Sequence, residues 1–326
     1  MSKSMCPCTC QPPRILQLAW IAALLFGLPG TSPAQTFTEY VIPTAGSDPF
    51  SITTGPDGAL WFTEWVGNKI GRITTAGVFT EYPLPNANST PIWIKPGPDN
   101  ALWFTEERGN RIGRITVHGA ISEYPLPTPE SRPWNLSVGP DGAFWFTEKA
   151  GRIGRITTAG VITEYPDPIS PWDITAGPDG AIWITERSGN QIARMTTSGV
   201  ITNQYTDPTP NSGPDVIITG VGDGDLWFTE QFGTKIAQMT TAGVITEYPV
   251  PTPTSQPGGL TVGSDDALWF TEHTGGQIGR LTLTGEIAEY PVPTPDADPM
   301  VIERGPDGAL WFTEFYGNKI GRITYP

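Results

Sequence analysis

"ALWFTEWVGNKIGRITTAGV" (Ala59–Val78) decides the fold, because the chain repeats it from end to end. The phrase holds two runs of β-branched and aromatic residues joined by a Gly-Asn turn. Its W-[FI]-T-E core returns every 38 to 44 residues. A period of this size indicates a repeat architecture. The seven copies begin at Trp61, Trp103, Trp145, Trp183, Trp227, Trp269 and Trp311.

Each repeat contains enough sequence for four strands. A proline-led strand ("PFSIT"), "ALWFTE", "KIGRIT" and "ITEYP" are separated by turns of the GPDG, GN and TAG kinds. Helical repeats are excluded because Pro and Gly interrupt every segment. Four-stranded units repeated around a ring make a β-propeller. The sequence therefore predicts an all-β fold, a seven-bladed propeller.

The two ends of the repeat array predict how the ring closes. "FTEYVIP" (Phe37–Pro43) is a fourth-strand sequence with no blade before it. The chain stops at "KIGRITYP" (Lys319–Pro326), a third-strand sequence with no fourth strand after it. Pairing the two would complete the last blade and remove an open sheet edge. We therefore expect residues 35–326 to form a single domain.

The N-terminal segment has the pattern of a signal peptide. Lys3 and Arg14 both precede the apolar run "ILQLAWIAALLFGLPG", and the small residues "SPA" end at Ala34. We expect cleavage after residue 34 and a secreted or periplasmic protein. An uncleaved anchor is the alternative, although the run is short for a membrane span. The three cysteines all precede the run, so the mature chain would contain no disulfide.

The charge of the chain excludes some partners. The net charge is −14, and removing two basic residues with segment 1–34 makes it −16. We therefore expect no nucleic acid partner and no membrane binding after signal cleavage. A cation, or a ligand with positive character, fits better. We expect a monomer that binds a small molecule, peptide or glycan.

The blade phrases carry a family resemblance. Seven W-[FI]-T-E…I-[GA]-[RQ]-[ILM]-T blades joined by "TEYP" segments resemble the virginiamycin B lyase, or streptogramin lyase, family. The resemblance implies a seven-bladed propeller that opens a cyclic depsipeptide by elimination. It also implies Mg²⁺ held by glutamates and a histidine general base. The residues themselves require no cofactor.

The positions that the family uses for catalysis are altered here. The resemblance places its two histidines directly after the prolines that open the innermost strands of the last two blades, which here means Gly258 and Met300. Its metal-binding glutamates correspond to Asp298 and Phe315. Aspartate can still bind a metal, but neither glycine nor methionine can accept a proton. The resemblance thus supports the fold and argues against the usual mechanism.

The residues that break the repeat are the better functional candidates. One follows each inner-strand proline, and together they could line an apolar ligand pocket or simply fill the channel. This ring is Phe50, Ile92, Trp134, Trp172, Asp215, Gly258 and Met300. With Gly258 set aside, the other six are the predicted ligand-binding residues.

The repeated glutamate of W-F-T-E has a structural interpretation in most blades. A four-residue hairpin loop puts Glu64 opposite Lys69, and the same register gives Glu106, Glu230 and Glu314 a Lys or Arg. A shorter loop in the third blade puts Glu148 opposite Arg152. Glu186 and Glu272 face Gln191 and Gln277 instead. Because hard cations take oxygen ligands, we consider Glu186, Glu272 and Asp298 as metal ligands.

One histidine lies on the expected functional face. His273 directly follows Glu272, and the two form the candidate catalytic pair. Adjacent strand residues point to opposite faces, so they could cooperate only if the strand ends at Glu272. The alternative is a solvated surface histidine.

Three functions fit these observations. The first is an exported propeller that binds a small molecule, peptide or glycan at the channel mouth without the family's histidines. The second is a Mg²⁺-dependent carbon–oxygen lyase with a non-standard base such as His273. The third is a scaffold for protein contacts, which the fold alone does not exclude. The sequence leaves open whether the chain is an enzyme.

Overall fold

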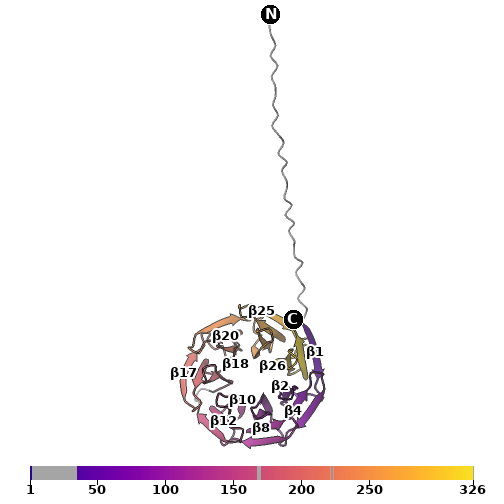
Figure 1. Cartoon of the computed structure of the whole chain (residues 1–326), viewed down its shortest axis with the longest axis vertical. Coiled ribbons are helices and arrows are strands. Elements are labelled where there is room, and N and C mark those ends of the chain that lie inside the picture. The colour runs from indigo at the N-terminus through magenta and orange to yellow at the C-terminus, as the bar shows by residue number, and fades with distance from the viewer. Residues whose placement is uncertain (2–34, 167–169, 221, 223, 326) are drawn as a thin grey trace. The chain divides into compact units, whose positions relative to one another are not determined.

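The computed structural model describes residue 1 and residues 35–325, except for residues 167–169, 221 and 223. The predicted signal peptide lies outside the described residues. Seven four-stranded antiparallel sheets make up the described chain and follow one another around a ring (Figure 1). No described helix is long and apolar enough to cross a membrane. The predicted seven-bladed propeller is confirmed.

Each blade runs from the centre of the ring to its rim. The inner strands are β2 (Pro49–Thr54), β6 (Pro91–Pro96), β10 (Pro133–Val138), β14 (Ile174–Ala176), β18 (Pro214–Thr219), β22 (Pro257–Val262) and β26 (Pro299–Arg304). The second strands are β3 (Leu60–Glu64), β7 (Ala101–Glu106), β11 (Phe144–Glu148), β15 (Ile182–Glu186), β19 (Leu226–Glu230), β23 (Leu268–Glu272) and β27 (Leu310–Glu314).

The outer half of each blade is more exposed. The third strands are β4 (Lys69–Ile73), β8 (Arg111–Thr116), β12 (Arg152–Ile156), β16 (Gln191–Met195), β20 (Lys235–Met239), β24 (Gln277–Leu281) and β28 (Lys319–Thr324). The rim strands are β5 (Phe79–Pro83), β9 (Ile121–Pro125), β13 (Ile162–Pro166), β17 (Ile201–Thr206), β21 (Ile245–Pro249), β25 (Ile287–Pro291) and β1 (Thr36–Val41). We number the blades 1 to 7 from β2 to β26.

The first strand closes the ring, as the sequence predicted. β1 pairs antiparallel with β28, from Thr36 opposite Thr324 to Val41 opposite Lys319. In Figure 1 the indigo β1 lies against the yellow end of the chain. The Lys319 ammonium also binds the Glu39 carboxylate at 2.7 Å. No blade among the described residues is therefore left with an unpaired third strand.

A hydrogen-bonded group of an aspartate, a tryptophan and an arginine, which we call the latch, repeats inside the blades. In blade 1 the Asp57 carboxylate accepts hydrogen bonds from Trp61 Nε1 at 2.9 Å and from Arg72 Nε at 2.7 Å. Tyr82 of the rim strand stacks on the other side of the indole, 5.5 Å between ring centres. Burial acts to raise the pKa of Asp57, but the bonds from Trp61 and Arg72 outweigh it and lower the pKa. Trp61 and Arg72 thus lie opposite each other in the hairpin, and Asp57 binds both side chains.

Candidate functional site

Two rings of varying residues meet at one end of the central channel. In six blades the inner strand begins opposite the end of the second strand, as where Pro49 pairs with Glu64. In blade 4 the inner strand β14 begins only at Ile174, opposite Ile184. Residues directly after the inner-strand proline and residues directly after W-[FI]-T-E line the same cavity at this end. The second ring is Trp65, Glu107, Lys149, Arg187, Gln231, His273 and Phe315.

The two rings enclose an inner cavity of about 190 Å³. Its aromatic wall is continuous: Phe50 lies 5.5 Å from Trp134, and Trp134 lies 4.9 Å from Trp172, between ring centres. Arg187, Asp215, Gln231 and His273 supply its polar groups. Asp215 is buried, and burial raises the pKa of its carboxyl group. An apolar pocket with a few convergent polar groups is typical of a small-molecule site.

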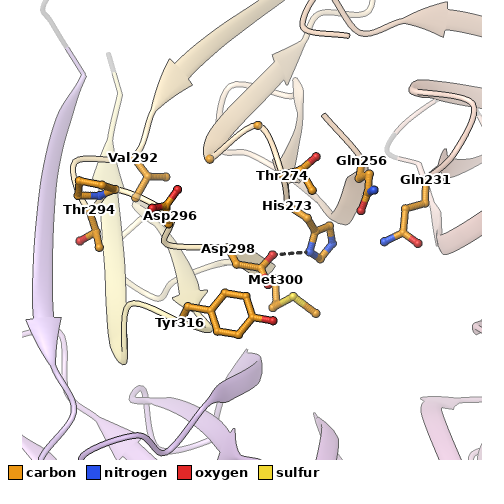
Figure 2. A pocket seen from close by; sticks show the side chains of 13 residues that line it. Gln231, Gln256, His273, Thr274, Val292, Thr294, Asp296, Asp298, Met300 and Tyr316 are labelled. Atoms are coloured by element: carbon orange, nitrogen blue, oxygen red, sulfur yellow. Dashed lines mark hydrogen bonds and ion pairs between the residues drawn. The ribbon is translucent and has the colours of Figure 1, made fainter. Parts of the chain in front are cut away.

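A larger outer cavity of about 720 Å³ opens beside it, over blades 6 and 7. The two cavities share Gln231, His273 and Met300. Figure 2 shows His273 between the two glutamines on one side and Asp298 on the other, with Met300 and Tyr316 close by. His273 is thus the titratable residue that faces both spaces.

His273 and Asp298 form a contact between blades 6 and 7. His273 Nδ1 lies 3.2 Å from Asp298 Oδ1, and the histidine side chain is only 9% exposed. An ionised carboxylate can only accept a hydrogen bond, so beside it Nδ1 is the donor, and in the neutral imidazole the lone pair then lies on Nε2. Nε2 fills the space above Gly258, where an added Cβ would lie 1.7 Å from it. The imidazole therefore occupies the place that a side chain at position 258 would take.

The structure brings most of the predicted ligand-binding residues together. Phe50, Trp134, Trp172, Asp215 and Met300 line the inner cavity. Ile92 is fully buried and does not reach it.

The predicted catalytic pair is not brought together. Glu272 is fully buried inside blade 6, while His273 turns toward Asp298 in blade 7. β23 ends at Glu272, and His273 begins the following turn, from which its side chain reaches Asp298 and not Glu272.

The expected ion pairs of the repeated glutamate are not formed. Glu64 does lie opposite Lys69 in the hairpin register. Lys69 Nζ, however, binds Glu81 of the rim strand at 2.9 Å, and Lys235 and Lys319 likewise bind rim glutamates. The reason is desolvation: an ion pair with a partly exposed rim glutamate removes less charge from water than an ion pair with a carboxylate buried in the blade.

Burial raises the pKa of these inner glutamates. The pKa of Glu64 rises to about 8, with the neighbouring Glu81 charge adding to the effect of burial. The pKa of Glu272 rises to about 7 for the same two kinds of reason, with Glu289 as the neighbour. Glu186 is also buried and accepts hydrogen bonds from the Gln204 amide. Two of the three metal candidates, Glu186 and Glu272, thus lie inside blades, whereas the third, Asp298, lines the outer cavity.

The cavity residues do not fit a Mg²⁺ ion. Mg²⁺ requires several oxygen ligands in octahedral geometry. At the positions implied by the family resemblance, Asp298 is engaged by His273, and Phe315 packs its ring 5.6 Å from Trp65 and 6.3 Å from Phe50. In the described chain, the acidic group close enough to share an ion lies elsewhere, at Asp207, Glu230 and Glu247. Lys235 already binds Glu247 there.

Sequence reasoning missed the cationic side of the inner cavity. Arg187 lines it, and Lys149 lies 3.4 Å from the centre of the Trp134 ring. Both occupy the position after W-[FI]-T-E, which holds a different residue type in each of the seven blades. That variation, set against constant neighbours, is the signal that could have found them.

Comparisons with known proteins agree with the geometry. The sequence model of the virginiamycin B lyase family matches residues 31–170 and 167–326. A solved streptogramin B lyase is 38% identical, with a TM-score of 0.85, over 90% of this chain and 98% of that one. A catalytically inactive virginiamycin B lyase from Staphylococcus aureus, solved with quinupristin, is 42% identical, also with a TM-score of 0.85, over 90% of this chain and 100% of that one.

One further match is local. It is 48% identical to the virginiamycin B lyase of Bacillus licheniformis over 40 residues, which is 12% of this chain and 14% of that protein. It therefore covers about one blade.

Proposed function

The chain belongs to the virginiamycin B lyase family, and from this premise we propose that it binds a small peptide or ester at the channel mouth and opens it by elimination, with His273 as the general base. One observation carries the proposal. His273 contacts Asp298, and its Nε2 lies over Gly258, the position at which the resemblance implies a histidine. The base would thus come from a neighbouring strand into the same place.

The chemistry needs a base near a carbon next to a carbonyl group. Nε2 of His273 would take the proton from that carbon, and the C–H electron pair would form a C=C bond. The bond from the adjacent carbon to the ester oxygen would break, so that the oxygen leaves as part of a carboxylate. Asp298 would hold the imidazole in the required tautomer and stabilise the imidazolium ion that forms. No step in this sequence passes through a metal ion.

Binding without catalysis is the second candidate. It is supported by Phe315, because an aromatic ring stands where the resemblance implies a metal-binding glutamate, and this ring packs against Phe50 and Trp65. The aromatic residues of the inner cavity would then hold a flat ligand, and His273 would only donate or accept a hydrogen bond.

Product mass separates these functions. The full chain is incubated with quinupristin, a ligand of one solved relative, and the products are analysed by mass spectrometry. Elimination within a ring leaves the mass unchanged and creates a new C=C absorbance, whereas hydrolysis adds one water. We expect the isomeric product from the wild type. If the wild type leaves the ring intact but quinupristin raises its melting temperature, the binding function replaces the lyase function.

A further inference from the structure

Arg187 is held rigidly at the wall of the inner cavity. Its guanidinium carbon lies 4.4 Å from the centre of the Trp172 ring and 4.6 Å from that of Phe232. Both contacts are cation–π interactions, which hold the guanidinium group without using its N–H donors. Phe232 is 59% exposed, so one side of the stack faces the solvent at the channel mouth.

The donors of Arg187 are not used by the part of the chain that the structure describes. No described carboxylate lies within ion-pair distance of Arg187. Asp215 is near enough for the charges of Arg187 and His273 to oppose the rise in its pKa that burial causes. A guanidinium fork with fixed orientation and free donors matches the two oxygens of a carboxylate.

The second cation of this sector is already neutralised. Lys149 Nζ binds Glu107 Oε1 at 3.0 Å and sits over Trp134. Burial also lowers the pKa of Lys149. Arg187 therefore remains the available cation of the inner cavity, although the chain as a whole carries a charge of −14.

We propose that Arg187 binds the carboxylate of an aromatic acid, whose ring lies against Trp134, Trp172 and Phe50 in the inner cavity. This inference rests on the proposed function in placing the ligand at this mouth, and it names the class of ligand. It also gives elimination a place for its leaving group, because the ester oxygen departs as a carboxylate. Arg187 and His273 line the same cavity, so one can hold that carboxylate while the other removes the proton.

Calorimetry with a matched pair of probes tests the proposal. N-acetyl-phenylalanine carries the carboxylate, and N-acetyl-phenylalanine amide is its neutral isostere. We expect the wild type to bind the acid about tenfold more tightly than the amide at low ionic strength. The variant Arg187→Gln should bind both equally.

Two further variants make the outcome specific. Arg108→Gln removes the same charge from the exposed loop of blade 2 and should keep the preference for the acid. His273→Gln should also keep it while losing turnover, so failure of the lyase function and failure of this inference are distinguishable. Equal binding of acid and amide by the wild type, or an undiminished preference in Arg187→Gln, would overturn the inference.

Discussion

At the scale of single residues, the site depends on an exchange between Gly258 and His273. A glycine stands where the resemblance implies a histidine, and an imidazole from the next strand fills the vacant space. The exchange is sterically exclusive, because any Cβ at position 258 would overlap Nε2 of His273. Gly258 does not have a positive φ, so alanine there brings no backbone strain.

The first residue-scale prediction concerns Gly258→Ala. The new methyl group should push the imidazole away from its position beside Asp298 and lower kcat/KM for ring opening about 100-fold, the range that one misplaced catalytic group costs. The melting temperature should barely change, because the displaced atom is the end of a flexible side chain. A variant with wild-type turnover would show that the position of His273 over Gly258 has no role.

The site could be predicted only in part, for a physical reason. Asp298 and His273 both stood out in the sequence, but His273 was paired with Glu272, its neighbour in the chain. The side chain that His273 contacts is Asp298, which lies in the next blade. Contacts between blades depend on the conformations of the loops at the channel mouth. Hairpin register within a blade contains no such information. Arg187 and Lys149 were missed for the same reason.

At the scale of the strand and blade, the repeated sequence encodes a latch. The Asp, Trp and Arg of each latch lie in a turn, a second strand and a third strand, so the latch ties three parts of one blade. The hairpin registers could be predicted because turn length fixes them. The lysine partners were predicted wrongly, because register does not say whether a side chain will choose a buried or a half-exposed carboxylate.

The prediction at this scale concerns Asp265→Asn in blade 6. Asp265 accepts from Trp269 Nε1 at 3.1 Å and from Arg280 Nε at 2.7 Å. An asparagine can accept only one of these bonds and turns an N–H group toward the other donor. The free energy of unfolding should fall by about 1–3 kcal/mol. Asp266→Asn, an exposed change in the same turn, is the control and should leave chemical denaturation curves unchanged. Equal stability of both variants would refute a role for the latch.

At the scale of the whole molecule, the fold could be predicted almost entirely. Seven copies of one phrase imply seven similar blades. The unpaired fourth-strand sequence at the start of the repeats and the unpaired third-strand sequence at their end imply a closed ring. The repeat also places one buried carboxyl group in each blade, the glutamate of W-[FI]-T-E. Their pKa values rise to about 7 for Glu106, Glu148, Glu272 and Glu314 and to about 8 for Glu64 and Glu230, with burial as the largest cause.

The whole-molecule prediction is a loss of stability as pH rises. Between about pH 4.5 and 7 the folded chain holds these protons while the unfolded chain has released them, and Glu64 and Glu230 keep theirs to about pH 8. The free energy of unfolding therefore falls with increasing pH across this range. The melting temperature should be several degrees higher at pH 5 than at pH 8.5. Glu106→Gln, which cannot ionise, should flatten part of this slope. A melting temperature that stays constant or rises over this range would contradict the protonation of the inner glutamates.

The central claim is that His273, held by Asp298, is the base of this propeller. The most direct measurement is kcat/KM for quinupristin opening by His273→Gln, compared with His118→Gln, which changes the other histidine of the sequence at an exposed turn. Removing a positioned base costs typically 10²–10⁴-fold. We expect a loss of about that size for His273→Gln and wild-type turnover for His118→Gln, with both variants equally stable. Equal turnover by the two variants would contradict the account.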